Sequence, residues 1–315
     1  MRKWPKKMAV FVLVLIVVTT LVGCGSSKPI VTFPDSNLEA AIREAIGKPE
    51  KDIHQSDLEG LTELHASGKV ITDLTGLEHC TSLTELHLGN TQISDLSPIS
   101  NLTSLARLYL ATNYISDVSP LFNLTSLTRL WIPGNQISDV SALRNLTSLT
   151  SLYISRNQIS DISPLENLTS LTSLYLDRNQ ISDVSSLENL VSLTDLSLSL
   201  NKISDISPLG NLARLTYLYL DNTQTSDISP LKNLTSLIWI TLSDNEISDV
   251  SPLENLTSLA SLYLQRNQIS DIEPLVNNPG LSQGDWLDLR GNPLSAISTD
   301  SYIPQLQARG VEVLW

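Results

Sequence analysis

The chain has 315 residues and carries 33 Asp and Glu against 20 Lys and Arg, which gives a formal net charge of −13. Nucleic acid partners are contacted through clustered cations, so this acidic balance argues against nucleic acid binding. It also argues against electrostatic attachment to a bare anionic membrane. Aromatic residues make up only 5% of the chain, so any core depends on aliphatic side chains.

Residues 1–23 have the features of an export signal. Residues 1–7 contain four Lys or Arg, and an apolar run follows from Met8 to Val22. At about 15 residues, this run is shorter than the roughly 20 that a membrane-spanning helix needs. It ends in Leu21-Val22-Gly23-Cys24, which resembles a bacterial lipobox. The resemblance implies cleavage before Cys24 and lipidation of that cysteine, so that only lipid anchors the exported protein to the membrane. An uncleaved anchor and a plain signal peptide are the alternatives.

A tether and a helical cap are expected next. The segment 24–32 is short and contains Gly25, Ser26 and Ser27, which suits a flexible tether. The segment 33–60 contains apolar residues at helical spacing from Leu38 to Ile46. Asp35 is placed to cap the start of this helix and Gly47 to end it. Stacked repeats expose raw core at each end, so this helix is predicted to close the N-terminal end of a solenoid.

A leucine or isoleucine recurs every 22 residues through most of the chain, and the register continues once more after a step of 25. The positions are Leu64, Leu86, Leu108, Leu130, Leu152, Leu174, Leu196, Leu218, Ile240, Leu262 and Leu287. A period in this range predicts a solenoid. We expect one elongated domain, with about eleven repeats over residues 61–294 and a C-terminal cap over residues 295–315.

Each repeat has three parts. The alternation around Leu108 and Leu110 predicts a short strand. An asparagine such as Asn113 then recurs, and a buried amide there can bond the backbone of its own coil and of the neighbouring coil. An aspartate such as Asp117 follows and is placed to cap a tight helical turn that begins near Pro120.

These Leu, Asn and Ile positions, from residue 61 to about residue 294, resemble the leucine-rich repeat proteins, specifically the 22-residue class of the internalins and the SDS22-like group. The resemblance implies an α/β repeat fold: a right-handed solenoid with a concave parallel β-sheet and short 3-10 turns on the convex side. The internalin resemblance also implies adhesion or receptor recognition. A phosphatase-regulating role, which the second group suggests, conflicts with the export signal.

Four positions depart from the repeat pattern. Thr91 and Thr223 replace the recurring asparagine, and Thr225 replaces the usual isoleucine, so we expect the coil at Thr223 to be the loosest. Cys80 takes a position that is leucine in the next repeats, which predicts a small core residue. If Cys24 is lipidated, Cys80 has no partner for a disulfide within the chain.

The aromatic residues gather in two neighbouring columns of the predicted sheet. Side chains between the two strand leucines must point out of the concave face. This column contains Tyr109, Trp131, Tyr153, Tyr175, Tyr219 and Tyr263, and the column just before it contains Tyr217, Trp239 and Trp286. Arg156, Arg178 and Arg266 are expected on the same face near the strand ends. Contiguous exposed aromatics are typical of a binding surface, although tyrosine also suits a half-exposed strand for structural reasons alone.

Other groups of residues have simpler interpretations. Glu63, His65, Glu85 and His87 lie one repeat apart and have the chemistry to hold Zn²⁺, but a polar patch is the simpler interpretation. The recurring aspartates suggest a calcium ladder, but helix capping explains each one locally. Asn-Leu-Thr triplets, such as the one at Asn101, recur because the repeat recurs, and we do not interpret them as glycosylation sites.

No nucleophile with a base partner, phosphate loop or metal triad is recognisable in the sequence. We therefore predict no enzyme and no cofactor. The predicted function is that of a lipid-anchored cell-surface module, of adhesion or receptor type, whose concave aromatic face binds a protein. Two alternatives stay open: a glycan-binding surface protein, because aromatic rings also stack on sugars, and a structural envelope protein without a specific ligand.

Overall fold

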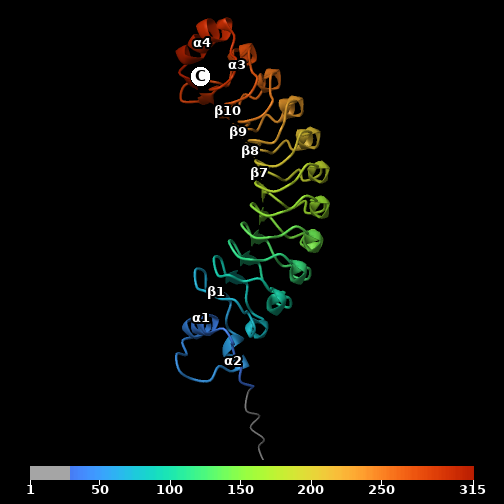
Figure 1. Cartoon of the computed structure of the whole chain (residues 1–315), viewed down its shortest axis with the longest axis vertical. Helices are drawn as coiled ribbons and strands as arrows, with labels where there is room; N and C mark the ends of the chain where they lie inside the picture. Colours follow the sequence, from blue (N-terminus) through green and yellow to red (C-terminus); the bar gives the residue numbers. More distant parts are fainter. Residues whose placement is uncertain (1–28) are drawn as a thin grey trace, which may run out of the picture.

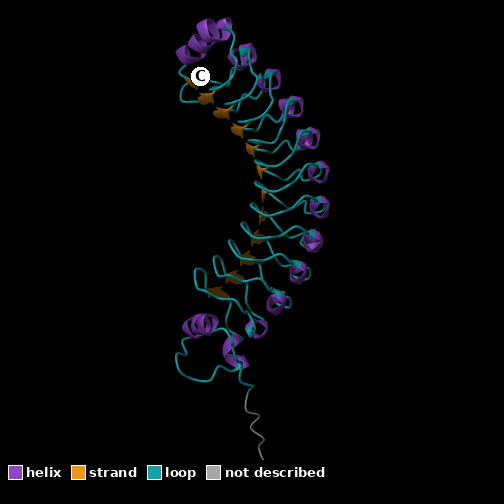
Figure 2. Ribbon diagram, viewed as in Figure 1, coloured by secondary structure: helices purple, strands orange, loops and turns teal. Residues whose placement is uncertain are grey.

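The described part of the chain, residues 29–315, forms one curved solenoid in the computed structural model (Figure 1). Its strands make a single sheet in chain order, and neighbouring strands run parallel. Figure 2 shows the strands along the concave side and the short helical turns along the convex side. This arrangement confirms the predicted solenoid.

The strands are three residues long and recur once per coil. They are β1 Glu63–His65, β2 Glu85–His87, β3 Arg107–Tyr109, β4 Arg129–Trp131, β5 Ser151–Tyr153, β6 Ser173–Tyr175, β7 Asp195–Ser197, β8 Tyr217–Tyr219, β9 Trp239–Thr241, β10 Ser261–Tyr263, β11 Trp286–Asp288 and β12 Glu312–Leu314. The 3-10 turns are η1 Leu77–His79, η2 Ser97–Ile99, η3 Ser119–Leu121, η4 Ser141–Asn145, η5 Ser163–Leu165, η6 Ser185–Leu187, η7 Ser207–Asn211, η8 Ser229–Asn233 and η9 Ser251–Leu253.

The core grows by one layer of aliphatic side chains per coil. In β6, Leu174 is fully buried, whereas Ser173 and Tyr175 on either side are only partly covered. Leu174 pairs with Leu196 of the next strand, so each leucine is covered by its counterpart in the neighbouring coil. A single coil cannot bury its own leucines, and the stability of the solenoid therefore arises between coils.

The recurring asparagine joins neighbouring coils, as predicted. Asn179 is buried, its Nδ2 donates to the carbonyls of Leu176 at 2.9 Å and Ile154 at 3.2 Å, and its Oδ1 accepts from the N–H of Ile159 at 3.1 Å. The same pattern recurs at Asn113. Because strands cover only three residues per coil, these side chains satisfy backbone groups that would otherwise be buried without partners.

In the coil that we expected to be the loosest, two threonines form side-chain hydrogen bonds in place of the recurring asparagine. Thr223 and Thr225 are fully buried, and their hydroxyl oxygens lie 2.9 Å apart. The Thr223 hydroxyl donates to the carbonyl of Leu220, and that of Thr225 donates to the carbonyl of Ile203 in the preceding coil. Of the bonds that the asparagine makes elsewhere, Thr223 keeps the one to the carbonyl three residues before it. Thr225 adds a bond to the preceding coil, and the N–H of Thr223 donates to Asn245 of the next coil, so this coil keeps side-chain hydrogen bonds to both neighbours.

The recurring aspartate bonds the start of each 3-10 turn. The Asp117 carboxylate accepts the backbone N–H of Ser119 at 2.8 Å and the hydroxyl of the same residue at 2.9 Å. Hydrogen bonds of the same kind hold the pKa values of several aspartates below the ordinary value of 3.8. These are Asp161, Asp183, Asp205 and Asp227. The capping interpretation of this column is therefore confirmed.

The N-terminal cap contains the predicted helix. Helix α1 spans Ser36–Ile46, and the Asp35 carboxylate accepts the N–H groups of Asn37 and Leu38 at 3.0 and 3.1 Å. Gly47 ends the helix with a φ of 67°, a left-handed conformation that favours glycine. A second short helix, α2 Gln55–Leu58, was not expected from the sequence.

The C-terminal cap combines α3 Glu273–Asn277, the π-helical turn η10 Ser298–Tyr302, α4 Ile303–Ala308 and strand β12. Its apolar side chains Ile303, Leu306, Val311 and Val313 are buried, which agrees with the predicted C-terminal cap. Val313 also pairs with Leu287, so the cap adds a twelfth strand to the sheet. The sequence did not predict this strand, because it has no leucine register.

Cys80 is fully buried, and burial raises the pKa of its thiol to about 12, which agrees with a core residue. The predicted export signal and the lipidation site at Cys24 lie outside the described residues. None of the helices within residues 29–315 combines the length and the apolar character that a membrane span requires.

Candidate functional site

The candidate site is the concave face of the sheet, where the third residue of each strand points away from the core. The strand register aligns these residues in one column, so that Tyr153 lies between Trp131 and Tyr175. The column begins with two histidines that the sequence had suggested for another role, His65 and His87, which the register aligns with Tyr109. The structure thus places the predicted aromatic column where the sequence expected it.

The rings stack on one another in three separate groups. The N-terminal stack contains His65, His87 and Tyr109, with ring centroids 4.2 Å apart at both contacts. The central stack contains Trp131, Tyr153 and Tyr175, with centroids 4.0 and 4.5 Å apart. The C-terminal pair is Trp239 and Tyr263, tilted at 5.1 Å.

Stacking covers much of the ring surface that the sequence had suggested would be open. Of the predicted aromatic residues, only Trp131 at 37% and Tyr217 at 38% count as exposed, and the others are half-buried. The interplanar angles of 24° and 11° in the central stack show that its rings lie nearly face to face. The aromatic column therefore presents mainly ring edges, and few open ring faces, to a partner on the concave side.

A polar seam separates the central stack from the C-terminal pair, and the sequence interpretation missed it. Ser197 and Thr241 take the tyrosine position in β7 and β9 and are buried. The Asp177 carboxylate accepts the hydroxyls of Ser155 at 2.6 Å and Ser197 at 3.2 Å. Asp221 accepts the Thr241 hydroxyl in the same way. The signal was present as Leu-Ser-Leu and Ile-Thr-Leu in place of Leu-Tyr-Leu.

Burial raises the pKa of Tyr175 to about 12, with the nearby Asp195 carboxylate adding to the effect. The pKa of Tyr219 is raised for the same two reasons. Both phenols therefore stay protonated at neutral pH and can donate a hydrogen bond from the concave face.

The Glu and His residues near the N-terminal end contact one another, and Glu85 also contacts Arg107. Glu85 contacts His87 at 2.7 Å and also pairs with Arg107, whose guanidinium holds the pKa of Glu85 below its ordinary value. His65 lies 3.9 Å from Glu63. Across residues 29–315, no group of three or more His, Cys, Asp or Glu side chains is arranged to hold a metal ion.

The three predicted arginines lie in the coil that follows each strand. Arg156, Arg178 and Arg266 have φ angles of 56°, 57° and 55°, in the left-handed region that disfavours residues with a side chain. Arg266 pairs with Asp244 at 3.2 Å. Arg156 and Arg178 are exposed and form no side-chain hydrogen bond or ion pair with any other described residue. The fold therefore makes no evident use of these two guanidiniums.

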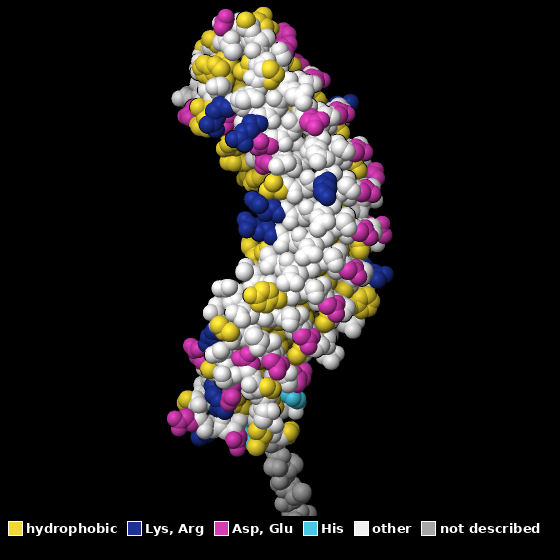
Figure 3. All heavy atoms as spheres, viewed as in Figure 1, with side chains coloured by type: hydrophobic (Ala, Val, Ile, Leu, Met, Phe, Trp, Pro, Cys, Tyr) yellow, Lys and Arg dark blue, Asp and Glu magenta, His cyan; other side chains and the backbone are white. Residues whose placement is uncertain are grey.

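Charge is distributed unevenly over the solenoid. Figure 3 shows Asp and Glu side chains along the convex side, and Lys and Arg side chains gathered on the concave side at mid-height and near the C-terminal end. Positive charge on the concave side is thus confined to these two places in this view.

A family model that describes two consecutive leucine-rich repeats matches this chain at residues 59–101, 81–123, 125–167, 147–189, 191–233 and 235–277. No match to a curated protein was found. Among solved structures, an internalin, inlF, from Listeria monocytogenes is 36% identical with a TM-score of 0.76, covering 90% of this chain and 88% of that one. Internalin C2 of the same species is 38% identical with a TM-score of 0.58, covering 74% of this chain and 94% of that one.

A plant peptide hormone receptor, RGFR1, solved in complex with RGF2, is 26% identical with a TM-score of 0.63. The match covers 76% of this chain and 46% of the receptor chain. The chain thus belongs to the leucine-rich repeat family, and within that family it is internalin-like. Domains of this kind are non-enzymatic and bind proteins, and the internalin relationship supports an exported, surface location.

Proposed function

We propose that the concave face of this chain binds a protein partner through the central stack and the two free arginines beside it. The single observation that carries this proposal is the stacking of Trp131, Tyr153 and Tyr175. Neighbouring rings already fix one another, so little side-chain entropy is lost on contact. Aromatic anchors of this kind supply much of the binding energy in protein interfaces.

The two arginines give this surface its charge preference. Arg156 follows Tyr153 by three residues and Arg178 follows Tyr175 by three, so both residues belong to the coils that directly follow the strands carrying the stack. Neither is neutralised by a carboxylate within residues 29–315. We therefore infer a partner with acidic groups opposite the ends of β5 and β6.

The geometry favours a protein over a glycan. A sugar ring stacks on the open face of an aromatic ring, but in the central stack the faces of Tyr153 are covered on both sides by Trp131 and Tyr175. The edges and hydroxyls that remain suit contact with polypeptide groups. Glycan-array hits lost when Tyr153 and Tyr175 are changed to Ala would support the alternative.

Proximity labelling on intact cells tests the proposal. The test variant is Trp131→Ala with Tyr153→Ala and Tyr175→Ala, and the control is Tyr114→Ala, an exposed tyrosine outside the strands. We expect wild type and control to label the same proteins, and the triple variant to lose a subset of them. An unchanged set in a triple variant with a wild-type circular dichroism spectrum would contradict binding through this face.

We further propose that the chain is exported and anchored through lipid on Cys24. The basic start, the apolar run and the Leu-Val-Gly-Cys sequence support this proposal. Cells grown with labelled palmitate are expected to label the wild-type protein but not Cys24→Ala. Equal labelling of the two proteins would contradict lipidation at Cys24, and absence of label from both would favour an uncleaved N-terminal anchor or a plain signal peptide.

A further inference from the structure

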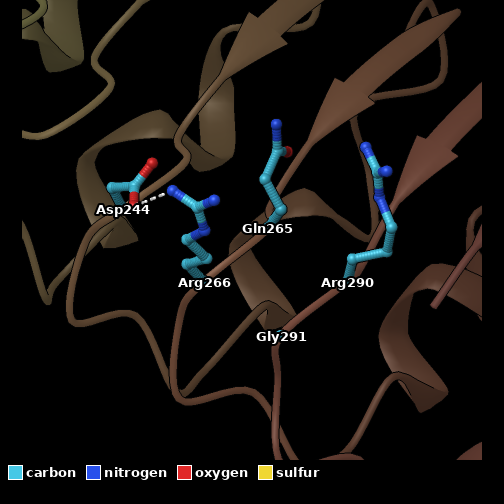
Figure 4. A pocket seen from close by; sticks show the side chains of 5 residues that line it. All are labelled: Asp244, Gln265, Arg266, Arg290 and Gly291. Atoms are coloured by element: carbon cyan, nitrogen blue, oxygen red, sulfur yellow. Dashed lines mark hydrogen bonds and ion pairs between the residues drawn. The ribbon is translucent and has the colours of Figure 1, made fainter.

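A polar pocket lies in the coils that follow β9, β10 and β11, next to the strands that carry the C-terminal pair. It is lined by Asp244, Gln265, Arg266, Arg290 and Gly291 and has a volume of about 330 Å³. Figure 4 shows Gln265 between the two arginines, with Arg266 paired to Asp244. Of the predicted site residues, only Arg266 lines this pocket, so it is distinct from the central stack.

The pocket is open because Gly291 has no side chain. Gly291 follows Arg266 in the column of left-handed coil residues, with a φ of 74°. A Cβ at this position would lie 3.2 Å from Cγ of Arg266 and would crowd it. The neighbouring coils carry Asp244 and Arg266 at this position, and the pocket therefore opens at the one coil of this group that has no side chain there.

Most of the N–H groups of the two guanidiniums are unused by the protein. Each guanidinium has five N–H donors. Arg266 uses one, at 3.2 Å to Asp244, and its side chain is 75% exposed. Arg290 uses Nε and Nη2 to hold both oxygens of Asp288, at 3.0 and 2.6 Å, and its side chain is 60% exposed.

Gln265 contributes an unused hydrogen-bond acceptor to the pocket. Its Oε1 is buried and has no hydrogen-bond partner among residues 29–315. In the preceding coils the equivalent positions carry Ser155, Asp177 and Asp221, which bond one another or Ser and Thr side chains of the polar seam. A buried acceptor without a partner is destabilising, and a donor from a ligand would remove that cost.

We propose that this pocket binds a carboxylate group of a polypeptide together with the backbone N–H next to it. The carboxylate accepts from Arg266 and Arg290, and a small rotation of the half-buried Gln265 side chain lets its amide oxygen accept the N–H. This inference rests on the proposed function, because it supplies a second anchor for a protein lying along the concave face. The anchor fixes the register of that protein at one end.

The charges favour a carboxylate over a phosphate. Arg266 and Arg290 are balanced by Asp244 and Asp288, so the pocket has no net charge to offset a dianion. A planar carboxylate matches the fork of a guanidinium and carries a single charge. It has only to displace Asp244, whose contact with Arg266 is a single exposed one, whereas Asp288 is buried and doubly bonded and stays in place.

The test uses small probes and NMR of the side chains that line the pocket. N-acetylglutamate amide has a side-chain carboxylate, N-acetylglutamine amide has none, and N-acetylalanine carries its carboxylate at the chain end. We expect saturable shifts of the Gln265 amide and the Arg266 Nε–H with a carboxylate probe but not with N-acetylglutamine amide. Whichever carboxylate probe binds more tightly identifies a side chain or a chain end as the source. Absence of saturable shifts with both carboxylate probes overturns the proposal.

Variants of the pocket sharpen this test. Arg266→Gln is expected to weaken binding of the probe by about tenfold, the loss of one charge-assisted hydrogen bond. Asp244→Asn is expected to strengthen it, because it removes the competing carboxylate. Arg214→Gln is the matched control, since Arg214 is also exposed, does not line the pocket and lies outside the proposed protein-binding surface, and it should leave the affinity unchanged. Equal affinity in Arg266→Gln and Arg214→Gln overturns the proposal.

The two proposals fail separately. The probes report on the pocket alone, whereas proximity labelling reports on the central stack. Loss of labelling in the triple variant with no probe binding would retain the proposed function and reject the pocket. Probe binding with unchanged labelling would reject the central stack as the binding surface and leave a carboxylate pocket.

Discussion

At the scale of single residues, the asparagine column shows how one side chain type is required by the fold. Asn179 closes three hydrogen bonds to backbone groups of two coils. The free arginines Arg156 and Arg178 lie at the other extreme, since they make no side-chain hydrogen bond or ion pair within residues 29–315. A repeat thus contains both residues whose side chains hold the fold together and residues whose side chains make no polar contact within the described part of the chain.

Asn179→Ala is expected to lower the free energy of unfolding by on the order of 1–3 kcal/mol, because it leaves the buried N–H of Ile159 without a partner. The carbonyls of Ile154 and Leu176 each lose one of two side-chain donors and keep the other, from Asn157 and Asn201. Gln180→Ala is the control, since this exposed neighbour makes only backbone hydrogen bonds, and it should change stability by less than about 0.5 kcal/mol. Urea unfolding followed by circular dichroism measures both. Similar midpoints for the two variants would show that the amide is dispensable.

The lowered pKa values of the capping aspartates predict how stability depends on pH. Hydrogen bonds from serine N–H groups place the folded-state pKa of Asp205 and its equivalents below 3.8. The stabilisation is therefore present above the unfolded-state pKa and is lost as the pH falls through the folded-state pKa. We expect the melting temperature to fall below about pH 4 for this reason.

The matched variant changes the four aspartates with lowered pKa, which are Asp161, Asp183, Asp205 and Asp227, to Asn. Asparagine keeps an oxygen that accepts the serine N–H but does not titrate. Its melting temperature should depend less steeply on pH between about pH 5 and 3 than that of the wild type. Identical slopes would mean that other carboxylates govern the acid response.

At the scale of elements, much of the fold could be predicted because each part depends on a local pattern. Helix α1 followed from Asp35, the spacing of its apolar residues and Gly47, and the strands followed from the leucine register. Strand β12 could not be predicted, since its pairing depends on Val313 meeting Leu287 across the fold of the cap.

The candidate face was predicted in position but not in organisation. The register alone aligned Tyr153 with Trp131 and Tyr175. Whether rings stack or lie open depends on torsion angles of side chains from different repeats, which no local pattern encodes. The hydrogen bonds of the polar seam are a similar case, because Ser197 and Asp177 come from different repeats.

The terminal caps are expected to stabilise only the repeats beside them. Leu306 of α4 and Leu38 of α1 are both fully buried, and replacing either with Ala should cost about 3 kcal/mol locally. Hydrogen exchange should quicken in β11 and β12 for Leu306→Ala and in β1 and β2 for Leu38→Ala, because repeats contact only their neighbours. Uniform quickening along all strands in either variant would show that the solenoid unfolds as one unit.

At the scale of the whole molecule, curvature and charge distinguish two faces. The convex side carries the capping aspartates at the starts of the 3-10 turns, and the strands of the concave side carry the stacked rings. Figure 3 shows Asp and Glu side chains along the convex side. Under the proposed function, a partner with acidic groups would be attracted to the concave face and repelled by the convex one.

Site-specific photo-crosslinking on intact cells tests the central claim most directly. One crosslinker replaces Tyr217 on the concave strand β8, which is 38% exposed, and the other replaces Phe122 beside the convex turn η3, which is 40% exposed. The two positions differ in face and hardly in exposure. Binding through the concave face predicts a discrete protein adduct from position 217 and none from position 122. Adducts of equal yield from both positions, or from position 122 alone, would contradict it.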